Sequence, residues 1–373
     1  MIEIAGKYTT AKIFTDDVEE TAVNQVKLLV DNPVFEGSSI RLMPDIHTGK
    51  IGPIGFTATF KDSIIPGLIG VDIGCGVSYV KIKAPKGIDF NKLDKVIREN
   101  VPAGFKIRST AHKYADCFDF DSLRCRKHID LNKARLSIGT LGGGNHFIEL
   151  DKSNDGDVYL VVHSGSRHLG VEVATYYMNE GHKVCDPSIP YEMTTLTGDL
   201  MYDYIADVCY LRTYAKYNRD AIIDEICSNM KWKYDSNDVY SCPHNYIDLY
   251  HNRYTIRKGA ISAYYTDKVI IPINMKDGVI LGKGKANKDW NYSAPHGAGR
   301  LYSRKETKEQ FTVSAFKKCM EGVYSTSIDA STLDESPFAY RSLDYVLENI
   351  KDTVEVTDIL HPIYNFKAGK GDN

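Results

Sequence analysis

The sequence predicts an α+β fold, in which a single large domain over residues 1–373 builds a β-sheet core around a dinuclear metal cleft. Strand-like apolar segments bounded by glycine and proline occur in both halves of the chain, with helical segments between them. No Ser/Pro-rich linker divides the sequence. Hydrophobic residues make up 43% of the chain and charged residues 25%, which is typical of a globular protein with a sizeable core. The metal cleft is predicted from motifs described below.

The N-terminal part of the chain predicts strands, two helices and a strand that ends in a polar turn. Residues 1 to about 85 alternate strand-like runs with Gly/Pro turns, and one helix is expected at "VEETAVNQVKLLVDN" (18–32). "FNKLDKVIRENV" (90–101) predicts a short helix because its apolar residues recur every three to four positions. "DVYLVVHSGSRHLG" (157–170) predicts a strand that ends at His163 and opens into a Gly/Ser turn.

A helical excursion from the β-rich core is predicted over residues about 170–231. Within it, residues 198–230 place apolar side chains at three-to-four spacing, which indicates a helical pair or one long helix. The chain then returns to strand-like runs at "VIIPINM" (269–275) and "GVILGKGK" (278–285). A last helix is expected at "SLDYVLENI" (342–350).

Charge, cysteine content and hydropathy limit the class of protein. The formal net charge is −3, so no global positive field indicates nucleic-acid binding and any polyanion site must be a local patch. Eight cysteines without regular spacing indicate free thiols in a reducing, cytoplasmic compartment. The N-terminal stretch lacks the apolar region of a secretion signal, and no apolar run approaches membrane length, so no membrane association is expected.

The stretch "VDIGCG" (71–76) places an acid and a thiol three residues apart in a glycine-framed turn. It is either a tight turn with a buried thiol or half of a metal site. A lone loop histidine is more often hydrogen-bonded locally than bound to metal, but several such loops together favour ligation. One thiolate, three imidazoles and one carboxylate are enough for two ions that share a sulfur. The candidate ligands are Asp72, Cys75, His146, His163 and His244. Residue types alone favour zinc.

The motif "HGAGR" (296–300) predicts an anion site. Gly297 and Gly299 allow the backbone to approach a phosphate closely, and Arg300 can neutralise it. His296 could then be a general base, a ligand or a nucleophile toward phosphorus. The alternative is a glycine-rich turn with a surface histidine.

Two further loops carry polar residues next to candidate ligands. Arg167 in "HSGSRHLG" suits an anion, and the alternative is a solvated turn. In "GGGNHFIE", Asn145 suits a phosphate or metal, and Glu149 can pair with the N–H edge of guanine. Turn chemistry and a surface strand are their alternatives. In "MPDIHTGK", His47 follows Asp45 by two residues.

Basic residues cluster in two places, and each cluster is either a solvated face or an RNA-binding surface. The first cluster is "RCRKH" (124–128). The second comprises Arg253, Arg257 and Lys258, and the interleaved Tyr246, Tyr250 and Tyr254 favour RNA there.

Seven motifs in order resemble the RtcB family of RNA ligases, which act in tRNA splicing and RNA repair. They are "MPDIHTGKIGPIG", "GVDIGCGV", "GGGNHFIE", "HSGSR", "SCPHN", "SAPHGAGR" and "SPFAY", and the match runs from about residue 40 to "PIYNFKA" at 362–368. The resemblance implies joining of 2′,3′-cyclic phosphate or 3′-phosphate RNA ends to 5′-hydroxyl ends. It also implies GTP and two Mn²⁺ ions as cofactors, in place of zinc, and a GMP–histidine intermediate.

By motif match, the resemblance assigns a role to each candidate residue. His296 would be the guanylylated nucleophile, and Asp45 would act near the RNA ends. Cys75 would bridge both ions, with Asp72 and His146 at one ion and His163 and His244 at the other. Phosphates would contact Asn145, Arg167, Gly297, Ala298, Gly299 and Arg300, and guanine would contact Glu149, Tyr340 and Lys367. The implied partners are RNA, as tRNA halves or cleaved structured RNA, and an archease-like or release-factor-like protein.

The chain also departs from the family pattern. "INMKDG" (273–278) replaces a "GSMG"-like turn and loses a serine that would contact guanine, and "GKGDN" (369–373) extends past the usual end. Together with the short chain, these departures suggest a divergent branch devoted to RNA repair. Two other functions fit the same residues. A dinuclear phosphoesterase acting on nucleotides or RNA ends would use "HGAGR" only as an anion clamp. A non-catalytic RNA-end-binding protein would have little reason to keep the full ligand set.

Overall fold

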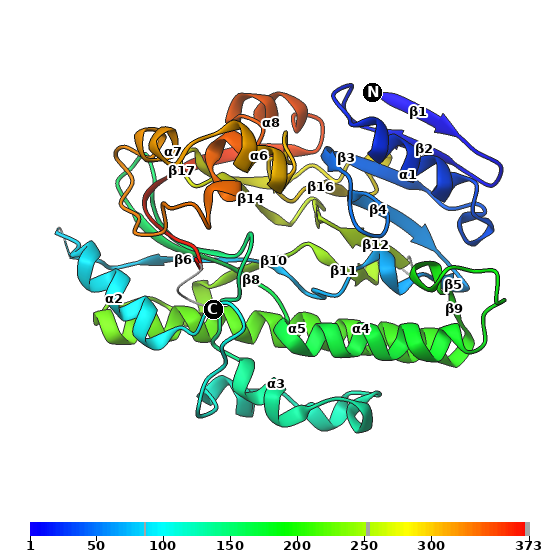
Figure 1. The fold of residues 1–373 in the computed structure, drawn as a ribbon, viewed down its shortest axis with the longest axis horizontal. Coiled ribbons are helices and arrows are strands. Elements are labelled where there is room, and N and C mark those ends of the chain that lie inside the picture. Colours follow the sequence, from blue (N-terminus) through cyan, green and yellow to red (C-terminus); the bar gives the residue numbers. More distant parts are fainter. Residues whose placement is uncertain (86, 251–253, 370–373) are drawn as a thin grey trace.

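Two β-sheets meet along a seam, with helices on both sides, in the computed structural model of the protein (Figure 1). The structure describes residues 1–85, 87–250 and 254–369. In the view of Figure 1, α4 and α5 run side by side along one side of the sheets, and α6, α7 and α8 lie on the opposite side. The helices are α1 (Glu20–Val30), α2 (Phe90–Asn100), α3 (Leu131–Ser137), α4 (Arg167–His182), α5 (Gly198–Met230), α6 (Arg304–Gln310), α7 (Val313–Cys319) and α8 (Leu343–Asn349).

The first sheet has six strands in the order β1-β2-β3-β4-β12-β11. Its strands are β1 (Ile2–Ala5), β2 (Thr10–Ile13), β3 (Ile40–His47), β4 (Ile54–Phe60), β11 (Asn245–Asp248) and β12 (Tyr254–Lys258). Only β2 and β3 pair in parallel, because α1 carries the chain back between them. The register of β3 shifts between Leu42 and His47, and Asp45 lies in this irregular stretch.

The second sheet has seven strands in the order β10-β6-β8-β7-β17-β15-β14, and every neighbouring pair is antiparallel. Its strands are β6 (Gly76–Ile82), β7 (Phe147–Lys152), β8 (Val158–Ser164), β10 (Tyr240–Pro243), β14 (Lys268–Asn274), β15 (Gly278–Gly284) and β17 (Val354–Phe366). Two short ribbons pair β5 (Ser63–Ile64) with β9 (Leu196–Thr197) and β13 (Ala260–Ser262) with β16 (Ser293–Pro295). His244 links β10 of the second sheet to β11 of the first, so the seam passes through this residue.

The 33-residue helix α5 packs against both sheets. Its N-terminal half, from Met201 to Tyr214, contributes to the apolar core under the six-stranded sheet. Its last turns, from Ile222 to Met230, belong to the core with the seven-stranded sheet and α2. No helix in the described ranges is long and apolar enough to cross a membrane.

The structure confirms the predicted mixed α+β class and the predicted elements. Helices α1, α2 and α8 lie within the predicted segments, and β14 and β15 coincide with the two predicted strands to within one residue. The strand expected to end at His163 is β8, which ends one residue later. Residues 198–230 form one long helix rather than a pair, with α4 preceding it.

The burial of α5 predicts a large effect of truncating its inner face. Ile223 is fully buried, so Ile223→Ala should lower the free energy of unfolding by about 2–5 kcal/mol, because it leaves a cavity in the core. Leu28 on α1 is 71% exposed, and Leu28→Ala should change it by less than about 0.5 kcal/mol. Urea unfolding of both variants measures the difference. Equal small effects would contradict the placement of α5 in the core.

Candidate active site at the seam of the sheets

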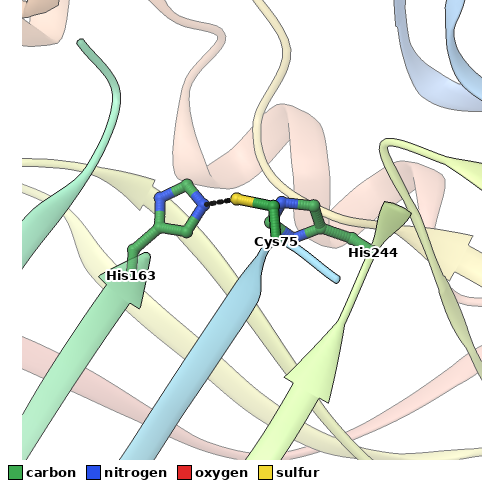
Figure 2. A group of neighbouring side chains, drawn as sticks. All are labelled: Cys75, His163 and His244. Atoms are coloured by element: carbon green, nitrogen blue, oxygen red, sulfur yellow. Dashed lines mark hydrogen bonds between the residues drawn. The ribbon is translucent and has the colours of Figure 1, made fainter. Parts of the chain in front are cut away.

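Three candidate ligands lie at the ends of three neighbouring strands. β10, β6 and β8 are adjacent, and their pairing sets Pro243 opposite Gly76 and Val77 opposite His163. This register brings Cys75, His163 and His244 together, with ligand atoms that all lie within 4.8 Å of one another. Figure 2 shows the three side chains pointing toward one another, and Cys75 Sγ lies 3.3 Å from His163 Nε2. All three are buried.

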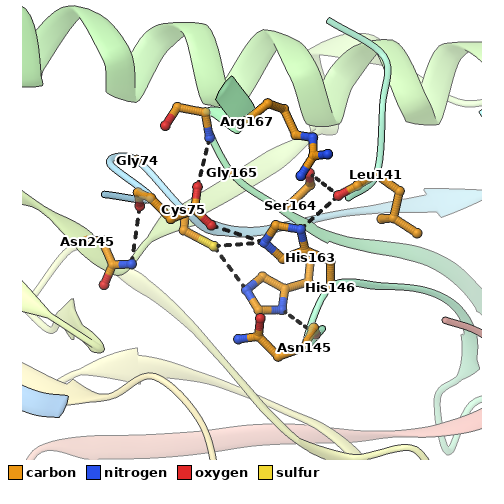
Figure 3. A network of polar contacts seen from close by, with 12 residues as sticks. Gly74, Cys75, Leu141, Asn145, His146, His163, Ser164, Gly165, Arg167 and Asn245 are labelled. Atoms are coloured by element: carbon orange, nitrogen blue, oxygen red, sulfur yellow. Dashed lines mark hydrogen bonds and ion pairs between the residues drawn. The ribbon is translucent and has the colours of Figure 1, made fainter. Parts of the chain in front are cut away.

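A second group shares the same sulfur atom. Asp72, Cys75 and His146 also place their ligand atoms within 4.8 Å of one another. His146 Nε2 lies 3.5 Å from Cys75 Sγ and 3.2 Å from an Asp72 carboxylate oxygen (Figure 3). The other Asp72 oxygen accepts a hydrogen bond of 3.2 Å from the Ser166 backbone N–H. The five predicted ligands therefore form two groups with Cys75 in common.

Backbone carbonyls determine which ring nitrogen of His146 and of His163 faces the other candidate ligands. His146 Nδ1 lies 2.8 Å from the Leu141 carbonyl oxygen, and His163 Nδ1 lies 3.1 Å from that of Asn145. A carbonyl only accepts, so both Nδ1 atoms carry a proton, and Nε2 is the nitrogen that each ring directs toward Cys75. Metal-bound histidines are usually held in this way.

The protonation chemistry of the cluster also fits a metal centre. Burial lowers the pKa of His163 and of His244, so both imidazoles are neutral and able to ligate. Burial, and then the charge of Asp72, raise the pKa of the Cys75 thiol. Burial opposes ionisation of Asp72 as well, but the hydrogen bond and charge of His146 outweigh it and lower its pKa to about 2. The donor set is thus one carboxylate, three imidazoles, of which those of His163 and His244 are neutral, and a thiol that a bound cation would help to ionise.

His296 is held by Asp45. The Asp45 side chain is 1% exposed, and one carboxylate oxygen lies 2.7 Å from His296 Nδ1 and 3.1 Å from the His296 backbone N. The carboxylate accepts both protons, which leaves the lone pair of His296 Nε2 free. Gly299 has φ +75° and leaves no room for a Cβ, which would lie 2.8 Å from the Asp45 carbonyl oxygen. The Asp45 carbonyl oxygen also lies 2.8 Å from Nδ1 of His47.

A cavity of about 740 Å³ lies beside His296 and His163. It is lined by most of the residues predicted to bind a nucleotide: Asn145, Glu149, Gly297, Ala298, Gly299, Arg300, Tyr340 and Lys367. Arg167 is not among the lining residues, and its guanidinium donates to the Gly104 carbonyl at 2.6 Å and to Thr140 Oγ1 at 3.2 Å. The structure therefore brings the predicted base and phosphate ligands together, with Arg167 set back from them.

Glu149, one of the residues that line the cavity, is buried and hydrogen-bonded. Its Oε1 accepts a hydrogen bond of 2.5 Å from the Asn365 side-chain amide. Burial raises the pKa of Glu149 to about 7, although the Asn365 hydrogen bond and the Lys367 charge oppose the rise. A carboxylate that ionises near neutral pH in a buried pocket can accept N–H donors from a purine edge.

Glu335 is a cavity residue that the sequence analysis missed. Its Oε2 accepts a hydrogen bond of 2.6 Å from the Tyr340 hydroxyl and lies 3.3 Å from Lys367 Nζ. Burial opposes its ionisation, but the charges of Lys367 and Arg304 lower its pKa to about 2. Its sequence signal was the acid directly before "SPFAY". Glu335 therefore fixes two of the three side chains predicted around guanine.

The second basic cluster was predicted to be either a solvated face or an RNA-binding surface. This prediction is wrong for Arg257 and Lys258. Arg257 is fully buried and lies 3.1 Å from an Asp248 carboxylate oxygen, and Lys258 is 8% exposed. The reason is that β12 is an interior strand between β4 and β11. Arg253 lies outside the described residues. In the first cluster, Arg126 and Lys127 are exposed.

The raised pKa of Glu149 predicts a pH dependence of stability. The folded-state pKa of about 7 lies above the unfolded value, so the contribution of Glu149 is fully present below about pH 4 and is lost as pH rises through 7. Between pH 5 and 7.5 the protein should lose about 2 kcal/mol more free energy of unfolding than Glu149→Gln. Urea unfolding of both proteins at the two pH values measures this. Parallel pH profiles would contradict the burial argument.

Comparisons with known proteins identify the family of the chain. A family model described as tRNA-splicing ligase RtcB matches residues 25–122 and 116–368. The chain is 28% identical to proteins named RNA-splicing ligase RtcB1 and RNA-splicing ligase RtcB of Escherichia coli, with 94% of each chain covered. It is 26% identical to a protein named tRNA-splicing ligase RtcB of Aeropyrum pernix, over 82% of this chain and 83% of that protein. The matches span nearly the whole sequence, and the chain belongs to the RtcB family.

Proposed function

We propose that this protein is an RNA ligase that joins RNA ends carrying a 2′,3′-cyclic phosphate or 3′-phosphate to RNA ends carrying a 5′-hydroxyl, in tRNA splicing or RNA repair. The observation that carries the proposal is the His296–Asp45 pair beside the cavity. An imidazole whose Nδ1 is bound to a buried carboxylate presents Nε2 as a nucleophile toward phosphorus. The names of the family relatives support this activity.

Two Mn²⁺ ions are the proposed metal cofactors, although the residue types alone favour zinc. Asp72, Cys75 and His146 would hold one ion, and Cys75, His163 and His244 the other, as the two groups support. When bound, the ions offset phosphate charge and polarise the phosphorus under attack.

GTP is the proposed source of the activating group. Glu149, Tyr340 and Lys367 would bind guanine, while Asn145 and the backbone of residues 297–300 would hold phosphates, since all line one cavity. The Arg300 guanidinium would add charge there. Arg167 would contact a phosphate only after it leaves the Gly104 carbonyl oxygen. Because "INMKDG" lacks the serine that would contact guanine, selectivity for guanine would depend on Glu149, Tyr340 and Lys367.

The proposed chemistry uses His296 and Asp45 in three steps. His296 Nε2 attacks the α-phosphorus of GTP, a P–N bond forms, and the bond to the pyrophosphate leaving group breaks. Asp45 keeps its hydrogen bond to Nδ1 and stabilises the charge on the imidazole. An oxygen of the RNA 3′-phosphate, which forms from a 2′,3′-cyclic phosphate by addition of water, then attacks the phosphorus of GMP, and the P–N bond to His296 breaks. The 5′-hydroxyl attacks the activated 3′-phosphorus and gives up its proton, a phosphodiester bond forms, and GMP leaves. Asp45 is also close enough to His296 to act near the RNA ends.

RNA, as tRNA halves or cleaved structured RNA, is the proposed macromolecular partner. An archease-like or release-factor-like accessory protein, a cytoplasmic location and a preference for repair over splicing remain predictions of the sequence. Joining of tRNA halves as the main activity in cells would contradict the preference for repair.

Replacing the nucleophile should abolish ligation. His296→Ala should join no 3′-phosphate RNA to 5′-hydroxyl RNA in the presence of GTP and Mn²⁺, because no other imidazole in the described chain is paired with Asp45 through its carboxylate. His112 is a buried imidazole that contacts Asp224 and Glu225, and His112→Ala provides a matched control that should still ligate. Ligation by folded His296→Ala would overturn the mechanism.

Removing the shared sulfur should remove metal. Cys75→Ala should lose Mn²⁺ at both positions and lose ligation, because Cys75 belongs to both ligand groups. Cys242 is a buried thiol on neighbouring β10 that belongs to neither group, so Cys242→Ala should retain both ions. Each protein is gel-filtered in buffer that contains Mn²⁺, and elemental analysis then measures how many Mn²⁺ ions are bound per chain. Full Mn²⁺ content in Cys75→Ala would contradict the proposed ligand set.

A further inference from the structure

Two polar side chains interrupt the apolar face of α5 directly beneath the metal ligands. Asn218 and Arg219 are both fully buried, and they lie where α5 passes from the core of the first sheet to that of the second. Burying an amide and a guanidinium there costs free energy unless each finds partners. Their partners are the loops and strands that carry the candidate ligands.

Arg219 contacts the three strands of the Cys75–His163–His244 group. Its guanidinium donates to the carbonyl oxygen of Gly74, next to Cys75, at 3.1 Å and to that of Ser164, next to His163, at 2.7 Å. It also donates to Ser78 Oγ on β6 at 2.9 Å and to Ser241 Oγ on β10 at 2.8 Å.

All four acceptors of Arg219 are neutral. Within the described chain no carboxylate lies within 4.0 Å of a guanidinium nitrogen of Arg219. The side chain is thus used as a planar fork of donors and not as one half of an ion pair. The fork ties β6, β8 and β10 at the level of the ligands.

Asn218 contacts the loop of the other group. Its Oδ1 accepts hydrogen bonds from the backbone N–H of Gly139 at 2.8 Å and of Thr140 at 3.0 Å, and its Nδ2 donates to the Gly165 carbonyl at 3.1 Å. Leu141 follows Thr140 in the chain, and its carbonyl oxygen orients His146. Gly165 precedes Ser166, whose N–H holds Asp72. Asn218 therefore holds the backbone segments whose polar groups orient Asp72 and His146.

We infer that Arg219 and Asn218 are positioning residues that each govern metal binding at a different one of the two ligand groups. Arg219 positions Cys75, His163 and His244, and Asn218 positions Asp72 and His146. This inference rests on the proposed metal centre. It follows because metal sites tolerate displacements of only about 0.2 Å, and residues that orient ligands change metal affinity by about 10–100-fold when replaced.

The test is to titrate Mn²⁺ into metal-free protein and to measure binding by isothermal titration calorimetry. The wild type and each single variant are titrated in the same way. Wild type should bind two ions. Arg219→Lys keeps the charge but not the donor fork, and it should weaken the ion at His163 and His244 about 10–100-fold and the other ion, which shares only Cys75 with it, by a smaller factor. Asn218→Ala should weaken the other ion by a similar factor.

Ligand variants identify which ion is affected. Arg219→Lys combined with His244→Ala should bind the remaining ion only slightly more weakly than His244→Ala alone, because both changes act mainly on the same position. Arg219→Lys combined with His146→Ala should weaken both ions. Arg257 is an equally buried arginine with its own partner Asp248, and Arg257→Lys controls for general loss of packing and should bind two ions normally.

The possible results separate this inference from the proposed metal centre. Two ions bound with wild-type affinity by folded Arg219→Lys, or equal weakening of both ions, would overturn the positioning role. Wild type that binds no Mn²⁺ would overturn the metal centre itself. Selective weakening that follows the His244 position would support both.

Discussion

The Sγ atom of Cys75 belongs to both candidate ligand groups, and the site is arranged around this shared atom. A buried thiol can serve two groups only if the carboxylate of its own turn and three imidazoles from other segments of the chain reach it. The antiparallel order β10-β6-β8 provides one side, because it sets three strand ends next to one another. The glycine-rich loop before β7 provides the other, and it delivers His146 with Nε2 directed at the sulfur.

The seam between the sheets explains how His296, the proposed nucleophile, comes to lie beside this cluster. Asp45 comes from the irregular part of β3 in the first sheet, and His296 follows β16, while His244 joins the two sheets. The His244 and His296 rings pack edge to face, with centroids 4.8 Å apart. The proposed metal ligands and the proposed nucleophile thus share one rigid junction, and the cavity opens beside it.

Local patterns in the sequence predicted the parts of the fold that local physics determines. The amphipathic helix α2 and the apolar strands β14 and β15 were predicted to within a residue. The 13-residue strand β17 was not, because register shifts near Pro362 break its alternation. The roles of Glu335, Asn218 and Arg219 depend on contacts between segments far apart in sequence, which no local pattern displays. The burial of Arg257 follows from the strand order, which the sequence does not specify.

The central claim is that His296 becomes covalently attached to GMP. The most direct measurement is incubation of the wild type with α-labelled GTP and Mn²⁺, followed by denaturing electrophoresis and mapping of the labelled peptide. The account predicts a label on the peptide that contains His296, linked through a phosphoramidate that is stable to base and cleaved by acid. A label on another residue, or none in protein that binds Mn²⁺ when ATP is tested as well, would contradict it.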